Sequence, residues 1–256
     1  VIYDAVGSIE TSEEFLARMS AAGIRLLEYG PLYPWRPNWS WFQRDHRKLL
    51  TIDGRAGFVG GMNLSDEGAP KEWGGRGWKD LQARVEGPVV RDLVRSFIGV
   101  WSRAGGPALD KRKHLVTVDQ LGPHLARLVG SQRAWLRRSI RRSLLHAFHR
   151  ARKSIYIANS YFVPDLGIRR RLKRAAQRGV EVRVLVPGNS DMPTVKRVSR
   201  VLYPELQTAG VKMYEWPAEM LHAKIACVDQ TWSHVGSFNL DRWSAVDNLE
   251  IAINIL

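Results

Sequence analysis

Apolar runs alternate with amphipathic stretches along this chain, in the order expected for strands and helices that follow one another. The stretch 180–186 is a nearly continuous apolar run, typical of a strand in a sheet buried on both faces. The stretch 88–101 places its apolar residues on one side at helical spacing. The same criteria predict strands at 1–3, 24–28, 49–52, 57–59, within 78–88, and at 155–158, 211–214 and 249–256, and helices from 11 or 12 to 22 and at 139–152, 164–177 and 194–208.

Strands that alternate with helices indicate an α/β protein with helices on the faces of its sheets. The basic connection 103–114 separates two halves, so we predict lobes at 1–110 and 111–256. The segment 68–77 is a Gly-rich loop. The loop 31–44 carries three prolines, three Trp, a Tyr and a Phe. Its rings suit a membrane-interface contact or a substrate-entrance wall, or they pack over the site.

The stretch HRKLLTIDGRAGFVGGMNLSD, from His46 to Asp66, recurs as HAKIACVDQTWSHVGSFNLD from His222 to Asp241. In both copies a His is followed by Lys at +2, Asp at +7, Gly at +14 and Asn at +17. Seven of the first 20 aligned positions are identical, far more than chance would give. This is an internal repeat. Two copies of a reactive triplet predict one active site built from two halves.

Paired histidines suit displacement at a phosphodiester, because one imidazole can attack phosphorus while the other transfers protons. A Lys two residues along a strand points to the same side as its His. Lysine ammonium and asparagine amide groups can neutralise the phosphate oxygens: Lys48, Lys224, Asn63 and Asn239. This chemistry requires no metal or other cofactor, and the sequence contains no carboxylate cluster that would hold a metal.

Each imidazole also needs a partner that fixes its tautomer. The candidate acids are Asp80, 34 residues after His46, and Glu250, 28 residues after His222. Asp53 and Asp229 fall at strand-end turns. Both a catalytic role and a structural role in the turn remain open for these two aspartates.

The charge balance favours anionic partners, since 39 Lys and Arg against 25 Asp and Glu give a net charge of +14. Part of this excess can reflect an arginine-rich genome. The single cysteine, Cys227, excludes an internal disulfide and a multi-Cys zinc site, and its apolar setting predicts a core residue. No apolar run is long enough to span a membrane. We expect the other histidines at the surface or in packing roles: His114, His124, His146, His149 and His234.

The two signatures, HxKxxxxDxxxxxxGGxN and HxKxxxxDxxxxxxGSxN, resemble the paired HKD motifs of the phospholipase D superfamily. The matching residues are His46, Lys48, Asp53, Gly60, Gly61 and Asn63 in the first, and His222, Lys224, Asp229, Gly236, Ser237 and Asn239 in the second. The surrounding KDLQARVEGPVVRDL, NSYFVPD and MLHAKIACVDQTWSHVGSFNLDRWS are similar to bacterial cardiolipin synthases, and the resemblance covers nearly the whole chain. It implies two similar mixed-sheet α-β-α lobes with the site between them.

The resemblance further implies a phosphatidyltransferase that forms a phosphohistidine and passes the phosphatidyl group to phosphatidylglycerol or another alcohol. We assign His46 as the nucleophile and His222 as the acid and base, with the reverse assignment open. The alternatives are a hydrolytic phospholipase D, a metal-independent endonuclease of the same superfamily, and a binding protein with an inactive site. The expected partners are anionic phospholipid and the surface of the bacterial inner membrane, where the protein would be peripheral. Nucleic acid is not expected, and protein partners are not predicted.

The repeat extends upstream of the motifs. Residues 184–191 match 1–8, and 209–217 match 22–31. The segment before 184 has no counterpart before Val1. We therefore expect the first lobe to be incomplete at its N-terminus, and some sequence to follow the final strand.

Overall fold

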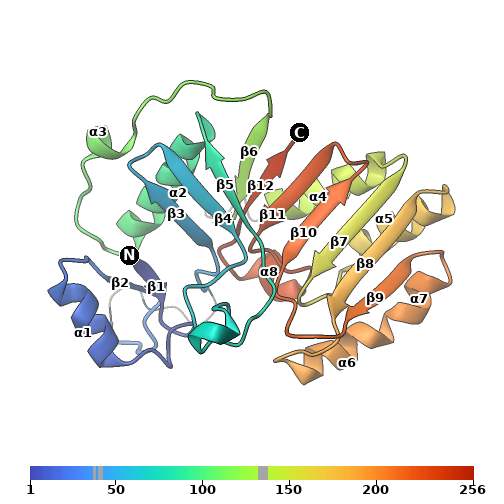
Figure 1. The fold of residues 1–256 in the computed structure, drawn as a ribbon, viewed down its shortest axis with the longest axis horizontal. Coiled ribbons are helices and arrows are strands. Elements are labelled where there is room, and N and C mark those ends of the chain that lie inside the picture. The colour runs from blue at the N-terminus through green and yellow to red at the C-terminus, as the bar shows by residue number, and fades with distance from the viewer. Residues whose placement is uncertain (37–38, 40–42, 132–137) are drawn as a thin grey trace.

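The computed structural model describes residues 1–36, 39, 43–131 and 138–256. It is a mixed α/β fold, as the alternation of strands and helices predicts. Three sheets follow one another from the blue to the red end of the chain (Figure 1). Within the described ranges no helix is long and apolar enough to cross a bilayer.

A seven-stranded sheet forms most of the second half. Its strands, in spatial order, are β6 (Ala126–Gly130), β12 (Ile251–Ile255), β11 (Trp232–Gly236), β10 (Lys224–Val228), β7 (Ser154–Asn159), β8 (Glu181–Pro187) and β9 (Lys212–Trp216). The strands β7, β8 and β9 are parallel, and the other neighbours are antiparallel. The helices of this half are α4 (Ser139–Arg150), α5 (Leu166–Gln177), α6 (Pro193–Val201), α7 (Tyr203–Gln207) and α8 (Arg242–Val246). Figure 1 shows α4 and α5 behind the sheet, where their apolar faces enclose the larger core.

The first half forms two smaller sheets. The antiparallel strands β3 (Lys48–Ile52), β4 (Ala56–Gly60) and β5 (Gln82–Glu86) pack against α2 (Val89–Arg103). The strands β1 (Ile2–Asp4) and β2 (Leu27–Tyr29) form a parallel pair connected by α1 (Glu13–Ala21). Short helices occur at η1 (Lys71–Trp73) and α3 (Lys111–His114).

The internal repeat is visible in the fold. The hairpin meander β3–β4–β5 repeats β10–β11–β12, and the parallel pair β1–β2 repeats β8–β9. In the second half β7 lies between β8 and β10 and joins them into one sheet. In the described part of the first half no strand joins β1 to β3.

The two halves share a hydrophobic core. Val59 of β4 and Leu93 of α2 pack in one cluster with Val235 of β11 and Ile253 of β12. The larger cluster lies entirely within the second half. Because one core draws on both halves, separating them would expose buried apolar surface. The division of the chain near residue 110 stays a prediction.

The structure corrects three element predictions. The helix predicted over 194–208 is two helices, α6 and α7, because Pro204 has no N–H to donate within a continuous helix. The connection 103–114 contains α3, whose first turn Asp110 caps by accepting a hydrogen bond from the Arg112 N–H at 3.0 Å. The strand β6 was not predicted, because it lies at a sheet edge and its first residues are exposed, which hides the apolar pattern.

We expect Leu93→Ala to lower the free energy of unfolding by about 3 kcal/mol, because this fully buried side chain packs in the core that both halves share. Leu50→Ala is the matched control, since Leu50 is exposed on β3 and its loss should cost about 0.5 kcal/mol or less. Urea unfolding measures both. Equal effects of the two substitutions would contradict the shared core.

Candidate active site

Two short backbone bridges connect the halves beside the motif histidines. The His46 N–H donates to the carbonyl of Leu249 at 3.0 Å, and the Leu249 N–H donates to the carbonyl of Arg44 at 2.8 Å. These two bonds form a parallel bridge. The His222 N–H donates to the carbonyl of Lys79 at 2.7 Å, and the Lys79 N–H donates to the carbonyl of Met220 at 2.8 Å. These two bonds form the second bridge. Each bridge brings the backbone of one half to the histidine of the other.

Each imidazole is held by a carboxylate from the opposite half. Glu250 follows Leu249, and its two oxygens lie 3.0 and 3.1 Å from Nδ1 of His46. Asp80 follows Lys79, and its Oδ2 lies 2.7 Å from Nδ1 of His222. A neutral imidazole in these contacts donates from Nδ1–H and leaves the Nε2 lone pair available. The structure thus brings both predicted acids to the motif histidines, in crossed pairs.

The pKa of each motif imidazole lies below its ordinary value, which favours the neutral form at pH 7. Burial lowers the pKa of His46 from its ordinary value, and the Glu250 carboxylate offsets only part of that effect. Burial also lowers the pKa of His222 to about 4, against the opposing hydrogen bond from Asp80. The side chain of His46 is 26% exposed, whereas that of His222 is 7% exposed. Of the two, His46 is therefore the more accessible to a substrate.

The two motif lysines lie beside their histidines. Nζ of Lys48 donates to the carbonyl of His46 at 2.7 Å, and Nζ of Lys224 donates to the carbonyl of His222. Burial lowers the pKa of Lys48 to about 8 and that of Lys224 to about 7. Lys224 also acts electrostatically on His46, as Lys48 does on His222. The reactive groups of both motif copies therefore converge on one place.

Gly61 and Ser237 occupy the same position in the two copies and lie against the two carboxylates. The Ser237 hydroxyl donates to Glu250. A Cβ on Gly61 would come within 2.4 Å of Asp80 Oδ1, so this position requires glycine for the carboxylate to approach. The motif glycines one position earlier, Gly60 and Gly236, lie against neighbouring backbone. A Cβ on Gly60 would come within 2.3 Å of the Leu81 carbonyl oxygen, and one on Gly236 within 2.5 Å of the Ile251 carbonyl oxygen.

The two motif asparagines differ in environment. Asn239 is buried, and its Oδ1 accepts a hydrogen bond from Ser160 Oγ at 2.7 Å. Asn63 is exposed. Ser160 follows β7, and the described part of the first half has no strand in the corresponding place. The structure therefore places only Asn239 inside the protein, and the predicted symmetry of the two amides is not present.

The motif aspartates lie at the opposite ends of their strands from the histidines. Asp53 and Asp229 both have left-handed backbones, with φ of 51° and 54°, in the turns that follow β3 and β10. The Asp229 carboxylate accepts backbone N–H groups of residues 152, 153 and 154 at 2.9, 2.7 and 2.8 Å. Asp53 is exposed in its hairpin. This geometry favours the structural interpretation of both residues.

Two aromatic residues that the sequence reasoning did not select lie beside His222. The ring centroids of Trp78 and Tyr161 are 5.4 and 6.4 Å from that of His222. The Tyr161 hydroxyl donates to Asp191 Oδ2 at 2.7 Å, and burial raises the pKa of Tyr161. Both residues lie in or beside the segments that carry the resemblance, NSYFVPD and KDLQARVEGPVVRDL, which was the available signal.

The remaining candidates have no contact with the site. Cys227 is half-buried on β10, and His234 is buried, with Nδ1 2.7 Å from Asn254 Oδ1. The other histidines are exposed. Across residues 1–36, 39, 43–131 and 138–256, no three His, Cys, Asp or Glu side chains gather in a way that could hold a metal. Of the aromatic loop, Tyr33 and Trp35 stack at 4.9 Å, while Trp41 and Phe42 lie outside the described residues.

Comparison with known proteins connects this geometry to a family. The family described as "Cardiolipin synthase, PLD-like domain" matches residues 144–256. The chain is 36% identical to cardiolipin synthase 2 of Bacillus cereus, over 98% of this chain and 49% of that protein. It is 35% identical to cardiolipin synthase B of Escherichia coli, over 100% of this chain and 62% of that protein. The chain thus spans about half the length of the Bacillus relative and less than two thirds of the other.

Solved structures give a weaker match. A phospholipase D family member, Nuc from Salmonella typhimurium, aligns with a TM-score of 0.43 and 24% identity. The alignment covers 52% of this chain and 83% of that one.

The crossed pairs predict the response of each imidazole to loss of its carboxylate. Asp80 raises the pKa of His222, so Asp80→Asn should lower this pKa further below about 4. Glu250→Gln should likewise lower the pKa of His46. NMR titration of the imidazole signals measures both values, and the nitrogen shifts report the tautomer.

Asp92→Asn is the matched control for these titrations, because Asp92 is exposed on α2 and pairs with Arg95. It should leave the pKa values of both histidines unchanged. If Asp80→Asn instead lowered the pKa of His46 and left that of His222 unchanged, the crossed pairing of histidines and carboxylates would be wrong.

Proposed function

Because the chain belongs to the phospholipase D superfamily, we propose that it is a phosphatidyltransferase of the cardiolipin-synthase type. The observation that carries this proposal is the crossed site, in which two neutral imidazoles are each fixed by a buried carboxylate and flanked by a lysine. A phosphodiester is the substrate that two facing imidazoles and two ammonium groups suit. The predicted lobes 1–110 and 111–256 would each supply one His-Lys pair and the carboxylate for the other.

We propose His46 as the nucleophile, a role that its greater exposure supports. Its Nε2 lone pair attacks phosphorus, the bond from phosphorus to the leaving alcohol breaks, and His222 gives that alcohol its proton. An anionic phosphodiester raises the pKa of the adjacent His222 on binding, so His222 can carry this proton into the step. The acceptor hydroxyl then gives its proton to His222 and attacks phosphorus, and the bond from phosphorus to His46 breaks.

Lys48 and Lys224 neutralise the non-bridging oxygens as their charge increases in the transition state. Lys224 is buried and Lys48 is half-buried, and electrostatic interactions are stronger in such an environment than in water. In this scheme the lysines supply the positive charge, and no metal or other cofactor takes part. Hydrolysis would use the same residues with water as the acceptor.

The proposed substrates are membrane phospholipids, with phosphatidylglycerol as donor and acceptor. The curated relatives are named cardiolipin synthases, and the net charge of +14 favours an anionic lipid surface. We propose a peripheral position on the bacterial inner membrane.

The decisive assay incubates the chain with phosphatidylglycerol vesicles, and separately with DNA, in the presence of a chelator. We expect a new lipid product in which a phosphatidyl group is joined to phosphatidylglycerol, and no cleavage of DNA. His46→Ala and His222→Ala should each reduce turnover about 10⁴-fold or more, because the two imidazoles act as a unit. His124→Ala, at an exposed position outside the motifs, is the control.

The products discriminate the alternatives. Phosphatidic acid as the main product would show hydrolysis in place of transfer, and DNA cleavage without lipid turnover would refute the lipid assignment. In the unsubstituted chain quenched during turnover we expect a covalent phosphohistidine at His46, which mass spectrometry of an acid-free digest detects and which His46→Ala abolishes.

The lysines should set the alkaline limit of activity. Both pKa values are lowered, and the ammonium form that binds phosphate is lost as pH rises through about 7 for Lys224 and about 8 for Lys48. We therefore expect kcat/KM, which reports the free enzyme, to fall between these values on the alkaline side. Lys224→Arg should move the fall to higher pH in whatever activity remains, because guanidinium stays charged. A pH profile unchanged by this substitution would contradict the assignment.

A further inference from the structure

Three strongly exposed tryptophans lie in separate segments of the chain. Trp35 precedes His46, Trp73 is in the η1 segment between β4 and β5, and Trp243 is in α8 between β11 and β12. Their exposed fractions are 78%, 81% and 67%. In the described part of the chain, every tryptophan that is more than half exposed is one of these three.

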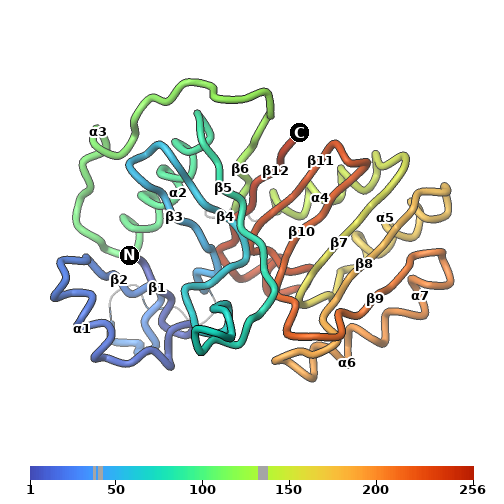
Figure 2. The backbone as a smooth tube through the Cα atoms, in the orientation of Figure 1, coloured from blue at the N-terminus to red at the C-terminus, as the bar shows by residue number. Residues whose placement is uncertain are grey.

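Contacts place two of these segments, those of Trp73 and Trp243, beside the site. The η1 segment pairs with the loop before His222 through an ion pair between Lys71 and Glu219. The Ser244 hydroxyl of α8 accepts the backbone N–H of Asn239 at 3.3 Å. Trp35 lies elsewhere, because it stacks on Tyr33 and the adjacent Arg36 pairs with Glu28 of β2. Figures 1 and 2 show η1, α8 and the start of β10 toward the lower edge of the molecule.

We call the region beside the site the docking edge: Trp73 with η1 and Trp243 with α8. Tryptophan favours the boundary between water and lipid, where its ring is buried and its N–H remains hydrated. The strongly exposed apolar side chains on the connection to β6 at the upper edge are leucines, Leu121 and Leu125. Two of the three strongly exposed tryptophans thus lie beside the site.

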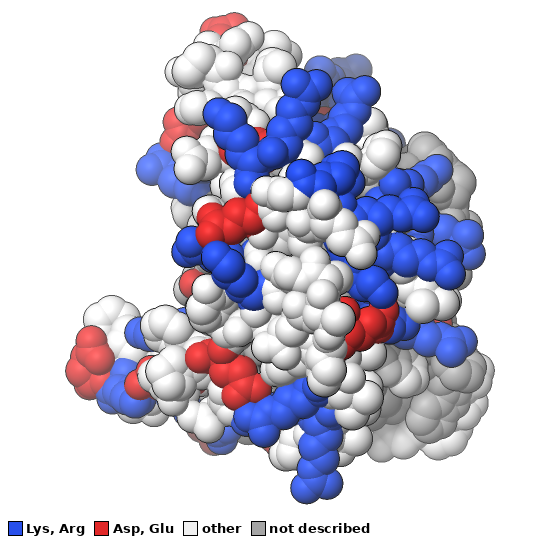
Figure 3. All heavy atoms as spheres, turned by 90° about the vertical axis from the view of Figure 1, so that its right-hand side faces the viewer, with Lys and Arg blue, Asp and Glu red and all other residues white. Residues whose placement is uncertain are grey.

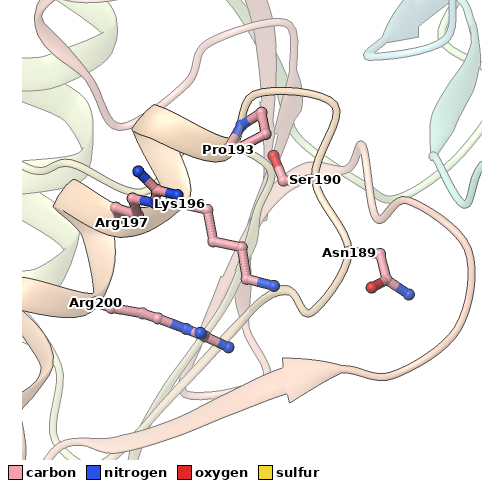
Figure 4. Close-up of a pocket in the computed structure, with 6 residues that line it drawn as sticks. All are labelled: Asn189, Ser190, Pro193, Lys196, Arg197 and Arg200. Carbon is pink, nitrogen blue, oxygen red and sulfur yellow. The ribbon is translucent and has the colours of Figure 1, made fainter.

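A basic pocket lies beside this edge, where α6 begins (Figures 1 and 4). Its cavity of about 300 Å³ is lined by Asn189, Ser190, Pro193, Lys196, Arg197 and Arg200. Figure 4 shows the Lys196 and Arg200 side chains extending from α6 into the space between this helix and Asn189.

The pocket keeps an excess of positive charge. Lys196 Nζ donates to the carbonyl of Gly188, and Arg200 pairs with Glu215 at 2.6 Å. Arg197 is exposed and forms an ion pair with no carboxylate among the described residues. The side of the molecule on which α5 and α6 lie is rich in Lys and Arg (Figure 3). The pocket is close to the site, because Asp191 of the same loop accepts the Tyr161 hydroxyl beside His222.

We propose that the docking edge inserts into the headgroup layer of an anionic bilayer, with the rings of Trp73 and Trp243 at the interface and a lipid phosphate held in the basic pocket. This inference rests on the proposed function, since it explains how a lipid phosphodiester reaches His46 without leaving the membrane. The partner is the lipid surface itself, because aromatic rings beside unpaired positive charge complement an apolar layer topped by phosphates.

The aromatic part is tested by co-sedimentation with vesicles of equal parts phosphatidylglycerol and phosphatidylcholine. Trp73→Ala with Trp243→Ala should weaken vesicle binding by about tenfold for each ring removed. The control, Leu121→Ala with Leu125→Ala, should bind as the unsubstituted chain does. Trp73→Phe with Trp243→Phe keeps the rings and should recover most of the binding. Unchanged binding of the alanine variant, or an equal loss in the control, would overturn the proposal.

The pocket is tested by Arg197→Gln, which removes one positive charge and no ion pair. It should weaken binding to the phosphatidylglycerol vesicles about fivefold and leave binding to pure phosphatidylcholine vesicles unchanged. Arg127→Gln, exposed on β6, is the charge-matched control and should have no such effect. Equal losses of vesicle binding for the two arginine substitutions would show general attraction by net charge. That result would overturn the proposal that the pocket holds a lipid phosphate.

Vesicle binding requires no turnover, so the two proposals can fail separately. Turnover is measured in parallel on a short-chain phosphatidylglycerol that is monomeric in water. If this lipid is converted while the tryptophan substitutions leave vesicle binding intact, the docking edge is wrong and the proposed function stands. If binding depends on the tryptophans and no lipid is converted, the docking edge stands and the proposed function is wrong.

Discussion

The site depends on one interaction, the hydrogen bond from the imidazole of one half to the carboxylate of the other. Glu250 is fully buried, and a carboxylate in that environment is stable only when it is paired and hydrogen-bonded. It contacts His46, accepts from the Ser237 hydroxyl and acts electrostatically on both motif lysines. The two lysines lie close enough to the two carboxylates for each carboxylate to raise the pKa of both, which opposes the effect of burial.

The two halves build the same site with different parts. The first half places Gly61 against a short carboxylate, Asp80, and the second places Ser237 against a longer one, Glu250. The first leaves Asn63 exposed, while the second buries Asn239 against Ser160. The two histidines differ as well, since the side chain of His46 is 26% exposed and that of His222 is 7% exposed. A repeat that is symmetric in sequence thus becomes a site whose two imidazoles can take different roles.

The sequence was sufficient to predict the α/β class and the residues that converge on the site. The reason is that the repeated His, Lys and Gly positions occupy equivalent places in the two halves. The sequence could not predict the crossing. The bonded pairs lie 204 and 142 residues apart and meet through backbone bridges outside any long strand, where no periodic pattern exists. The role of the motif aspartates stayed open for a related reason. Asp229 is held in place by three backbone N–H groups at a turn, a role that its spacing from His222 does not reveal.

The distance along the chain between His46 and Glu250 has a consequence for synthesis. A ribosome releases His46 long before the segment that carries its carboxylate, so early in translation this imidazole has no fixed tautomer and no partner histidine. The nascent first half therefore lacks a complete site. The site is complete only when β12 docks and Glu250 reaches its place beside Ser237. The order of synthesis thus makes the fixing of His46 one of the last steps in folding.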